Sequence, residues 1–351
     1  MIQLHARFTE NLTVKDELLA ALQAALLLEH ATVPLYLQAT WSLPPTPVGV
    51  PDTNKPIRNL IRDIAMEEML HMNLVANLIN ALGGQPVMNT PDFLMAFPGR
   101  LPGTIQTSLE VHLRAFSKKQ VEEVFMEIEE PEKPKEFKLK AFEGFELPAT
   151  SVTIGQFYGA IRKAIADGNE AELFTGDASR QIAINVDDDE GILVTDKATA
   201  LAAIDMIIEQ GEGNDSSPLE SATGEPAHYY RFQGILKGRV LQADASVPEG
   251  YSFSGDAVPF NPAAVTNVKD NVRISDLVGT PAEAPAREFN RAYTGMLADL
   301  HLAFNGDTDA MDRAVNTMYT LGAMARKLMR FEITSGVFAG PTWEYDASPV
   351  E

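Results

Sequence analysis

The segment 57–83 reads IRNLIRDIAMEEMLHMNLVANLINALG and has the spacing of an amphipathic helix. Its apolar residues share one side of the helical wheel: Ile61, Ile64, Met72, Val75, Leu78, Ile79 and Leu82. The other side carries Arg62, Asp63 and the asparagines at 73, 77 and 80. Glu68 and His71, however, fall in the middle of the apolar side. An ionised carboxylate costs several kcal/mol to bury unless it is paired or bound to a cation, so this placement indicates a functional site.

Two other segments place a carboxylate on an apolar helix face. In segment 14–43, Glu29 shares a face with Leu18, Leu22, Ala25, Val33 and Tyr36. In segment 196–210, Glu209 lies near the end, on the face of Ala198, Ala202 and Met206. One such residue is weak support, but several at related positions predict a metal site in which cations offset the buried negative charge.

Composition limits the classes of function. The chain has 351 residues, 45% of them hydrophobic, with a net charge of −21 and no cysteine. The charge disfavours nucleic acid and anionic membrane surfaces as partners, and the lack of cysteine excludes disulfides, zinc–thiolate sites and thiolate nucleophiles. The beginning of the chain has no signal-peptide pattern, and no apolar run reaches the ~20 residues of a membrane span. We therefore expect a soluble, cytoplasmic protein that acts on a small molecule, with its oligomeric state open between monomer and homo-oligomer.

The pattern of helices predicts an all-α fold. Segments 14–41, 57–83, 196–210 and 226–238 are expected to form one four-helix bundle. Two closing helices, about 285–304 and 307–332, are joined by a tight turn and should form an antiparallel hairpin. We expect residues 1–245 to form the bundle, with an irregular insertion at about 100–195. Residues 246–351 should form an irregular segment and the helix pair packed on the bundle, and sheet should be minor and confined to the insertion.

The spacing of the polar residues matches a known type of metal site. Glu68 and His71 are three residues apart, as are Glu225 and His228, and one helix with a lone glutamate precedes each pair. Carboxylate-bridged di-iron and di-manganese bundles follow this plan, and oxygen and imidazole ligands without sulfur suit iron or manganese. The predicted cofactor is therefore two iron ions, with manganese as the alternative, and the predicted ligands are Glu29, Glu68, His71, Glu209, Glu225 and His228.

Several assignments leave an alternative open. Asp205 or Glu212 could replace Glu209, and Glu225 could be a helix N-cap because it directly precedes Pro226. Two further residues are candidate catalytic residues. Tyr36 lies two turns after Glu29 and is either a proton donor or radical relay, or a core residue. Arg231 lies one turn after His228 and could pair a ligand carboxylate, contact an acidic substrate or form a plain salt bridge.

Four stretches carry a resemblance to a known family: LLLEHATVPLYLQATWSL, IRDIAMEEMLHMNLVANLINALGG, AIDMIIEQGEG and EPAHYYRFQGI. The chain resembles the ferritin-like domain family related to iminophenylpyruvate dimer synthase, which acts in violacein- and rebeccamycin-type bis-indole pigment pathways. YSFSGDAVPFNP and the paired closing helices extend the likeness over most of the chain. The resemblance implies a ferritin-like four-helix core whose metal positions are Glu29, Glu68, His71, Glu209 and His228.

These observations favour a metal-dependent oxidoreductase, with a di-iron carboxylate centre, that oxidises a small, amino-acid-derived or other organic substrate with dioxygen or peroxide. One alternative is an enzyme of secondary metabolism that couples amino-acid-derived imines. Another is a non-catalytic metal-binding or storage protein, although the long insertions argue against a storage shell. The last is a structural relic whose polar core residues pair with one another.

Overall fold

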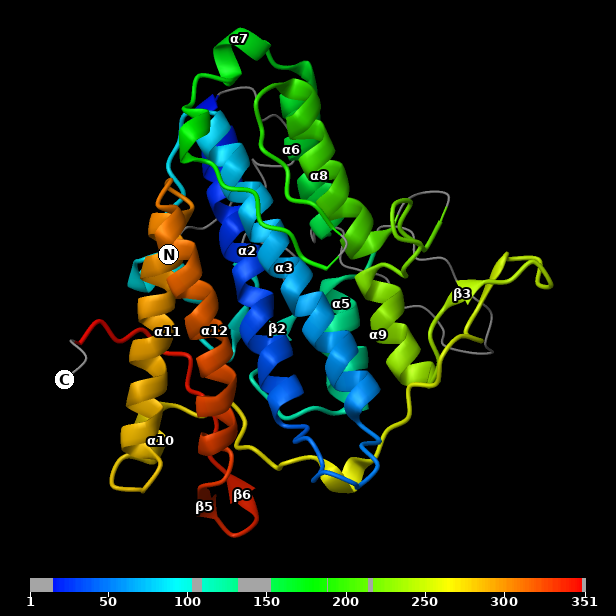
Figure 1. Ribbon diagram of the computed structural model, residues 1–351, viewed down its shortest axis with the longest axis vertical. Coiled ribbons are helices and arrows are strands. Elements are labelled where there is room, and N and C mark those ends of the chain that lie inside the picture. Colours follow the sequence, from blue (N-terminus) through cyan, green and yellow to red (C-terminus); the bar gives the residue numbers. More distant parts are fainter. Residues whose placement is uncertain (1–14, 103–108, 132–152, 188, 214–216, 349–351) are drawn as a thin grey trace.

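Two long antiparallel helices form the spine of the molecule. The computed structural model describes residues 15–102, 109–131, 153–187, 189–213 and 217–348. α2 (Lys15–Trp41) and α3 (Lys55–Ala81) each have 27 residues, which corresponds to about 40 Å of helix. They lie side by side over most of the height of the molecule (Figure 1). A ligand that is placed near the middle of either helix is therefore buried at mid-height.

The other two positions of the four-helix bundle, which we call its columns, are each made of two shorter helices that are interrupted at mid-height. α6 (Ile154–Asp167) and α8 (Lys197–Glu212) pack against each other in the upper half (Figure 1). In the lower half, α9 (His228–Lys237) packs against a short helix made of α4 (Lys118–Gln120), the π-helical segment η3 (Val121–Phe125) and α5 (Met126–Ile128). The end of α5 and the start of α9 therefore lie at mid-height.

The breaks have local causes. α8 is followed by Gly213 in a left-handed conformation at φ +81°, where a side chain would be strained. Its neighbour α9 begins only at His228, because Pro226 pairs with Leu219 in an isolated antiparallel bridge and stays extended. The predicted helices 196–210 and 226–238 therefore form one interrupted column.

The all-α prediction is confirmed, and two details of it are corrected. α6 lies within the segment that we expected as an insertion, yet it packs against α2 and α8 as part of the bundle. Sheet is minor, as expected, but it is not confined to that segment: the antiparallel pairs are β1 (Gly99–Arg100) with β2 (Glu110–Val111), β3 (Gln242–Ala243) with β4 (Tyr251–Ser252), and β5 (Glu332–Thr334) with β6 (Val337–Phe338). Short helical turns complete the described elements: η1 (Pro91–Phe93), α7 (Glu170–Leu173), η4 (Ala178–Arg180), η5 (Pro262–Ala264) and α10 (Ile274–Leu277).

The closing helices form the predicted hairpin. α11 (Glu283–Ala303) and α12 (Thr308–Leu328) are joined by a turn in which Gly306 has φ +106° and Asp307 caps α12 by accepting a hydrogen bond from the Ala310 amide. The hairpin is fixed to α2, since the Tyr293 hydroxyl and His30 Nε2 form a hydrogen bond of 2.7 Å. His30 is thus buried on the hairpin side of α2.

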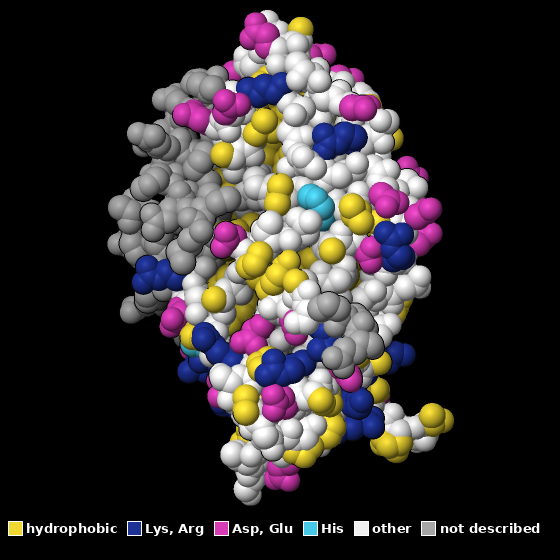
Figure 2. Space-filling view, turned by 90° about the vertical axis from the view of Figure 1, so that its left-hand side faces the viewer, with side chains coloured by type: hydrophobic (Ala, Val, Ile, Leu, Met, Phe, Trp, Pro, Cys, Tyr) yellow, Lys and Arg dark blue, Asp and Glu magenta, His cyan; other side chains and the backbone are white. Residues whose placement is uncertain are grey.

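The outer surface beside the hairpin mixes both signs of charge. Seen from the side on which α11 lies in Figure 1, acidic and basic side chains are interspersed around a central group of apolar side chains (Figure 2). The negative net charge is therefore not gathered into one continuous field on this face. α2 itself is long and apolar enough to cross a membrane, but 72% of its most apolar window is buried inside the protein, as in the core helix of a soluble bundle.

The asparagines on the polar side of α3 do not face solvent. Asn77 donates to the carbonyl oxygens of Ile182 and Ile192 at 2.7 and 2.9 Å, and Asn80 donates to that of Phe304 at 2.6 Å. Each of these asparagines is almost fully buried. The polar side of α3 therefore holds residues 180–187 and 189–194 and the end of α11 against the bundle.

Replacing Asn77 with alanine should destabilise the fold by about 2 kcal/mol, because two buried carbonyl oxygens lose their donor. The measurement is chemical unfolding of the two proteins. Arg62→Ala is the control, since the Arg62–Asp63 pair is largely exposed and should contribute under 1 kcal/mol. Equal effects of the two substitutions would show that the backbone at Ile182 and Ile192 does not depend on the Asn77 amide.

Candidate metal centre

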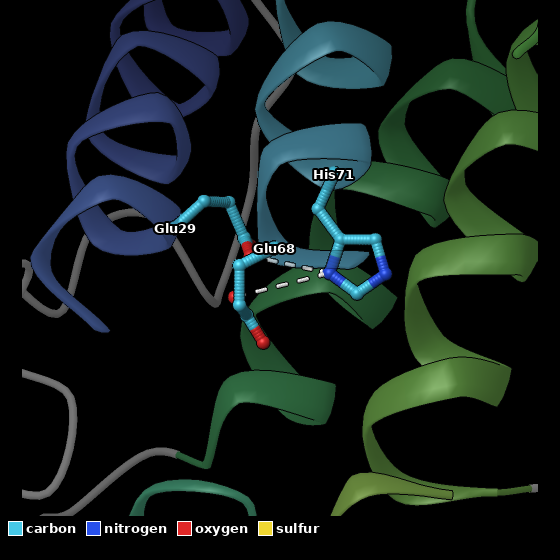
Figure 3. Close-up of side chains that lie close together, drawn as sticks. All are labelled: Glu29, Glu68 and His71. Carbon is cyan, nitrogen blue, oxygen red and sulfur yellow. Dashed lines mark ion pairs between the residues drawn. The ribbon is translucent and has the colours of Figure 1, made fainter. Parts of the chain in front are cut away.

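Three side chains of the two long helices converge at mid-height. Glu29 comes from α2, and Glu68 and His71 come from α3; their side chains point toward one another (Figure 3). His71 Nδ1 lies 3.4 Å from Glu29 Oε2 and 3.9 Å from Glu68 Oε2. All three residues are at least 96% buried. A buried set of two carboxylates and one imidazole nitrogen can hold a cation.

A second set lies beside the first and uses the broken columns. Glu129 directly follows α5, and His228 is the first residue of α9. His228 Nδ1 lies 3.0 Å from Glu68 Oε1 and 3.5 Å from Glu129 Oε2. The ligand atoms of Glu68, Glu129 and His228 lie within 4.8 Å of one another, as do those of the first set. Glu68 therefore belongs to both sets, with one oxygen near each histidine.

The donor atoms fit a pair of metal ions. His228 Nδ1 is buried and makes no hydrogen bond of good geometry, although carboxylate oxygens surround it. A bound cation would satisfy this nitrogen and offset the charge of the three carboxylates. A cavity of about 20 Å³ is lined by Glu29, Thr32, Glu68, His71 and Glu129, among others. This volume accommodates an ion or one water molecule, so in this structure it does not admit an organic molecule.

Each histidine is oriented from behind by a different acceptor. His71 donates from Nε2 to Gln210 Oε1 at 2.8 Å, and Gln210 in turn donates to Asp189 Oδ2 at 2.7 Å. His228 donates from Nε2 to Glu67 Oε2 at 2.9 Å. Both rings therefore present Nδ1 to the cluster, because a hydrogen bond at the other nitrogen fixes the tautomer of a metal-binding histidine.

Two tyrosines and a threonine hold the carboxylates. The Tyr158 hydroxyl donates to Glu29 Oε1, and the Tyr36 hydroxyl donates to Glu129 Oε1. Thr32 Oγ1 lies 3.2 Å from Glu68 Oε2. Burial, followed by the negative charges of these glutamates, raises the pKa of both tyrosines well above its usual value. The two phenols therefore remain protonated donors, which orients one oxygen of each outer carboxylate.

Without cations, protons balance the charge of this cluster. Burial and the negative charges of Glu129 and Glu29 raise the pKa of Glu68 to about 8. Burial opposes protonation of the two histidines, but the negatively charged carboxylates close to both rings outweigh it and raise the pKa of His71 and His228 above the usual value. Metal ions would displace these protons, because a ligating imidazole must be neutral and a ligating carboxylate ionised at its donor atom.

Four of the six predicted ligands meet in the cluster: Glu29, Glu68, His71 and His228. Glu209 lies outside it, because its carboxylate accepts hydrogen bonds from the Ser221 amide and hydroxyl at 2.9 and 2.5 Å. The two alternatives on α8 have other partners as well: Glu212 accepts from the Gly155 amide, and Asp205 pairs with Arg162 at the surface. The contribution of α8 is instead Gln210, which holds His71.

The prediction for Glu225 is also corrected. The helix begins at His228 with Ala227 as its N-cap, so Glu225 lies before the helix and is not brought beside His228 by helical spacing. Its side chain is 63% exposed, and it is neither a cluster residue nor the cap of α9. Arg231 is buried behind the cluster, where it pairs with Glu67 at 2.5 Å and Glu220 at 2.6 Å. It therefore holds a carboxylate that orients His228, rather than facing the cavity.

Glu129 was missed by the sequence-based interpretation, which left it in the irregular insertion at about 100–195. A signal was present, since Val121, Val124, Phe125 and Ile128 form an apolar helical face that Glu129 continues at i+4 and i+8. The many neighbouring glutamates obscured this signal. The same short helix contains the π-helical segment η3, a feature that is frequent at functional sites. Nothing in the sequence pattern predicted it.

Replacement of Glu129 and Glu209, one at a time, distinguishes the observed cluster from the predicted one. Glu129→Gln should remove one of two bound metal ions, because it takes a carboxylate from one set only. Glu209→Gln should leave metal content unchanged and at most loosen the Ser221 loop. Metal content after anaerobic loading with iron(II) measures both effects. If Glu209→Gln loses metal and Glu129→Gln does not, Glu209 is the ligand and Glu129 is not.

The fold and the cluster together define a helical bundle with a carboxylate–histidine centre between its helices. The family model described as Ferritin-like matches residues 22–237, and the chain belongs to this family. The matched range includes every residue of the two sets.

Two relatives extend the comparison. The chain is 27% identical, over 404 aligned positions, to dichlorochromopyrrolate synthase of Lentzea aerocolonigenes. The alignment covers 98% of this chain but only 37% of that protein, so the chain spans little more than a third of the length of this relative. A crystal structure of a ferritin-like protein from Caulobacter vibrioides superposes with a TM-score of 0.58 at 22% identity and covers 94% of this chain and 97% of that one. This second likeness supports the fold alone.

Proposed function

We propose that the chain binds two iron ions and uses them to oxidise a small organic substrate with dioxygen or peroxide. The observation that carries this proposal is the pair of ligand sets that share Glu68. A shared carboxylate with one oxygen toward each set is suited to bridge two cations, and one imidazole per position leaves coordination sites for small molecules. Manganese fits the same donor atoms and is the alternative metal.

The chain's own residues have separate parts in this proposal. Bound iron would supply redox chemistry, while the protein holds the ligands and excludes bulk water. Tyr36 and Tyr158 each keep their hydroxyl proton and donate it in a hydrogen bond to a ligand carboxylate, so both phenols hold a proton beside the cluster. The small cavity favours an oxidant of one or two heavy atoms beside the cluster. A larger substrate would be held at the outside of the cluster or would enter after a change of conformation.

The partner in this proposal is a small-molecule substrate in the cytoplasm. A net charge of −21 would repel nucleic acids and anionic membrane surfaces. The name of the relative of Lentzea aerocolonigenes places that protein in biosynthesis, which supports a substrate from secondary metabolism.

Coupling of amino-acid-derived imines is the second candidate function. The identity of 27% to a protein that is named as a synthase favours it. The chain, however, spans 37% of that protein, so the coupling activity of the longer chain does not transfer by length alone. The two candidates differ in their products: the first gives one oxidised molecule per substrate molecule, whereas the second joins two imine molecules into one product.

Elemental analysis followed by oxygen uptake tests the proposal. Protein purified without added metal, and then loaded anaerobically with iron(II), should hold two iron ions per chain and consume oxygen when exposed to it. Glu68→Gln is the matched variant, since it preserves size while removing the shared carboxylate. Retention of no iron by the wild-type protein, or iron binding that is equal in Glu68→Gln, would overturn the proposal.

A further inference from the structure

The two proposed metal positions have matched ligands but different surroundings. Each position offers one outer glutamate, one oxygen of Glu68 and one histidine Nδ1. Each outer glutamate also accepts a hydrogen bond from one buried tyrosine. The positions differ behind the histidines, where Gln210 accepts from His71 and Glu67 accepts from His228.

The acceptor behind His71 is a neutral amide. Gln210 Nε2 donates to the carboxylate of Asp189, which can only accept, and this fixes the amide oxygen toward His71. An amide oxygen is a modest acceptor. It therefore orients the ring but polarises the Nε2–H bond only weakly. We call the position of Glu29, Glu68 and His71 the Gln210-backed position.

The acceptor behind His228 is an ionised carboxylate held in place by an arginine. Glu67 accepts from His228 with one oxygen and from Arg231 with the other, at 2.9 and 2.5 Å. Arg231 is held in turn by Glu220, and all three residues are at least 93% buried. The Arg231 charge keeps Glu67 ionised, and Glu220 offsets that charge. We call the position of Glu68, Glu129 and His228 the Glu67-backed position.

This difference should make the ring of His228 the stronger metal ligand. Hydrogen bonds to a charged acceptor are roughly twice as strong as neutral ones, and a carboxylate behind a histidine raises the basicity of the ring at its other nitrogen. Glu67 also adds a negative charge close to that position. The two cations would repel each other across the shared Glu68, so the second ion must bind more weakly wherever the first one lies.

We propose that Glu67 makes the two metal positions inequivalent, so that the Glu67-backed position fills first and the Gln210-backed position fills second. Glu67 is a positioning residue in this inference, because it acts on the metal through His228. The inference rests on the proposed function only in requiring that the cluster binds two divalent cations. It requires no particular substrate or reaction.

Anaerobic titration with manganese(II) tests the order of filling, with free manganese(II) measured by electron paramagnetic resonance. The wild-type protein should bind one tight and one weaker ion. Glu67→Gln should weaken the tight binding by roughly 10- to 100-fold, the usual effect of removing such a partner, and leave the weaker binding within a factor of about two to three. The reciprocal variant, Gln210→Glu, should tighten the weaker binding.

Two ligand variants assign the tight ion to its position. Glu29→Gln should preserve the tight binding and remove the weaker one, whereas Glu129→Gln should remove the tight one. A wild-type crystal soaked with less than one equivalent of manganese(II) should show anomalous density beside His228. This measurement assigns the tight ion even if one of the variants fails to fold.

Equal affinities for the two ions would overturn this inference alone. So would a tight binding that survives Glu67→Gln unchanged, or first occupancy beside His71. A wild-type protein that binds no divalent cation would overturn the metal centre itself and this inference with it. The titration therefore separates failure of the loading order from failure of the proposed function.

Discussion

Replacing Glu68 with glutamine is expected to abolish the binding of both metal ions, with affinity at each position falling on the order of 100-fold or more. Glu68 is the residue that both ligand sets contain, so one substitution removes a donor from each. The same change should stabilise the metal-free protein, because Glu68 is 97% buried beside Glu29 and Glu129, and an amide removes the repulsion while keeping the shape.

Metal titration and thermal unfolding of wild type and Glu68→Gln measure these two effects. Glu123→Gln is the control, since Glu123 is more than half exposed and pairs only with Lys119 among the described ion pairs. If metal leaves the wild-type midpoint unchanged and Glu68→Gln destabilises the protein with or without metal, Glu68 is a structural hydrogen-bonding residue and the cluster is not a metal centre.

The metal-free protein should lose stability as pH rises from about 5 to 9. Glu68 has a folded-state pKa of about 8, raised from an ordinary value of 4.5, so the folded state binds more protons than the unfolded state between these values. Its stabilising contribution is complete below pH 4.5 and is lost as pH rises through 8. The raised pKa values of His71 and His228 act in the same direction above pH 6.5.

Other carboxylates act in the opposite direction, but at lower pH. The pKa of Glu67 falls to about 2, because its bonds to His228 and Arg231 outweigh burial, and that of Glu29 is lowered overall by His71. Their contributions are lost only as pH falls below about 4.5, so they do not mask the decline at neutral and alkaline pH.

Metal should reverse this dependence. Because binding releases protons from the histidines and Glu68, affinity should rise with pH, and a hundredfold excess of metal over Kd should add about 2.7 kcal/mol to the free energy of unfolding. Unfolding midpoints between pH 5 and 9, with and without iron(II) under anaerobic conditions, check both effects. A metal-free protein whose stability rises over this range would mean that the cluster carboxylates are ionised and paired without metal.

The long helices, and the half of the cluster that they carry, could be predicted from the sequence. Glu68 and His71 lie on one continuous helix, so a spacing of three fixes their relation, and the apolar face of α2 fixes Glu29 in the same way. The sequence also predicted where the two hairpin helices meet, since the turn at Asn305, Gly306 and Asp307 ends one helix and caps the next.

The other half of the cluster depends on how separate segments pack and could not be predicted from the sequence. Glu129 and His228 lie where two columns of the bundle are interrupted, and helical spacing carries no information across an interruption. The same spacing that predicted Glu225 beside His228 fails, because the chain is extended at Pro226 and the helix has not yet begun. Periodicity places residues only within one continuous helix, and packing between separate segments places the rest.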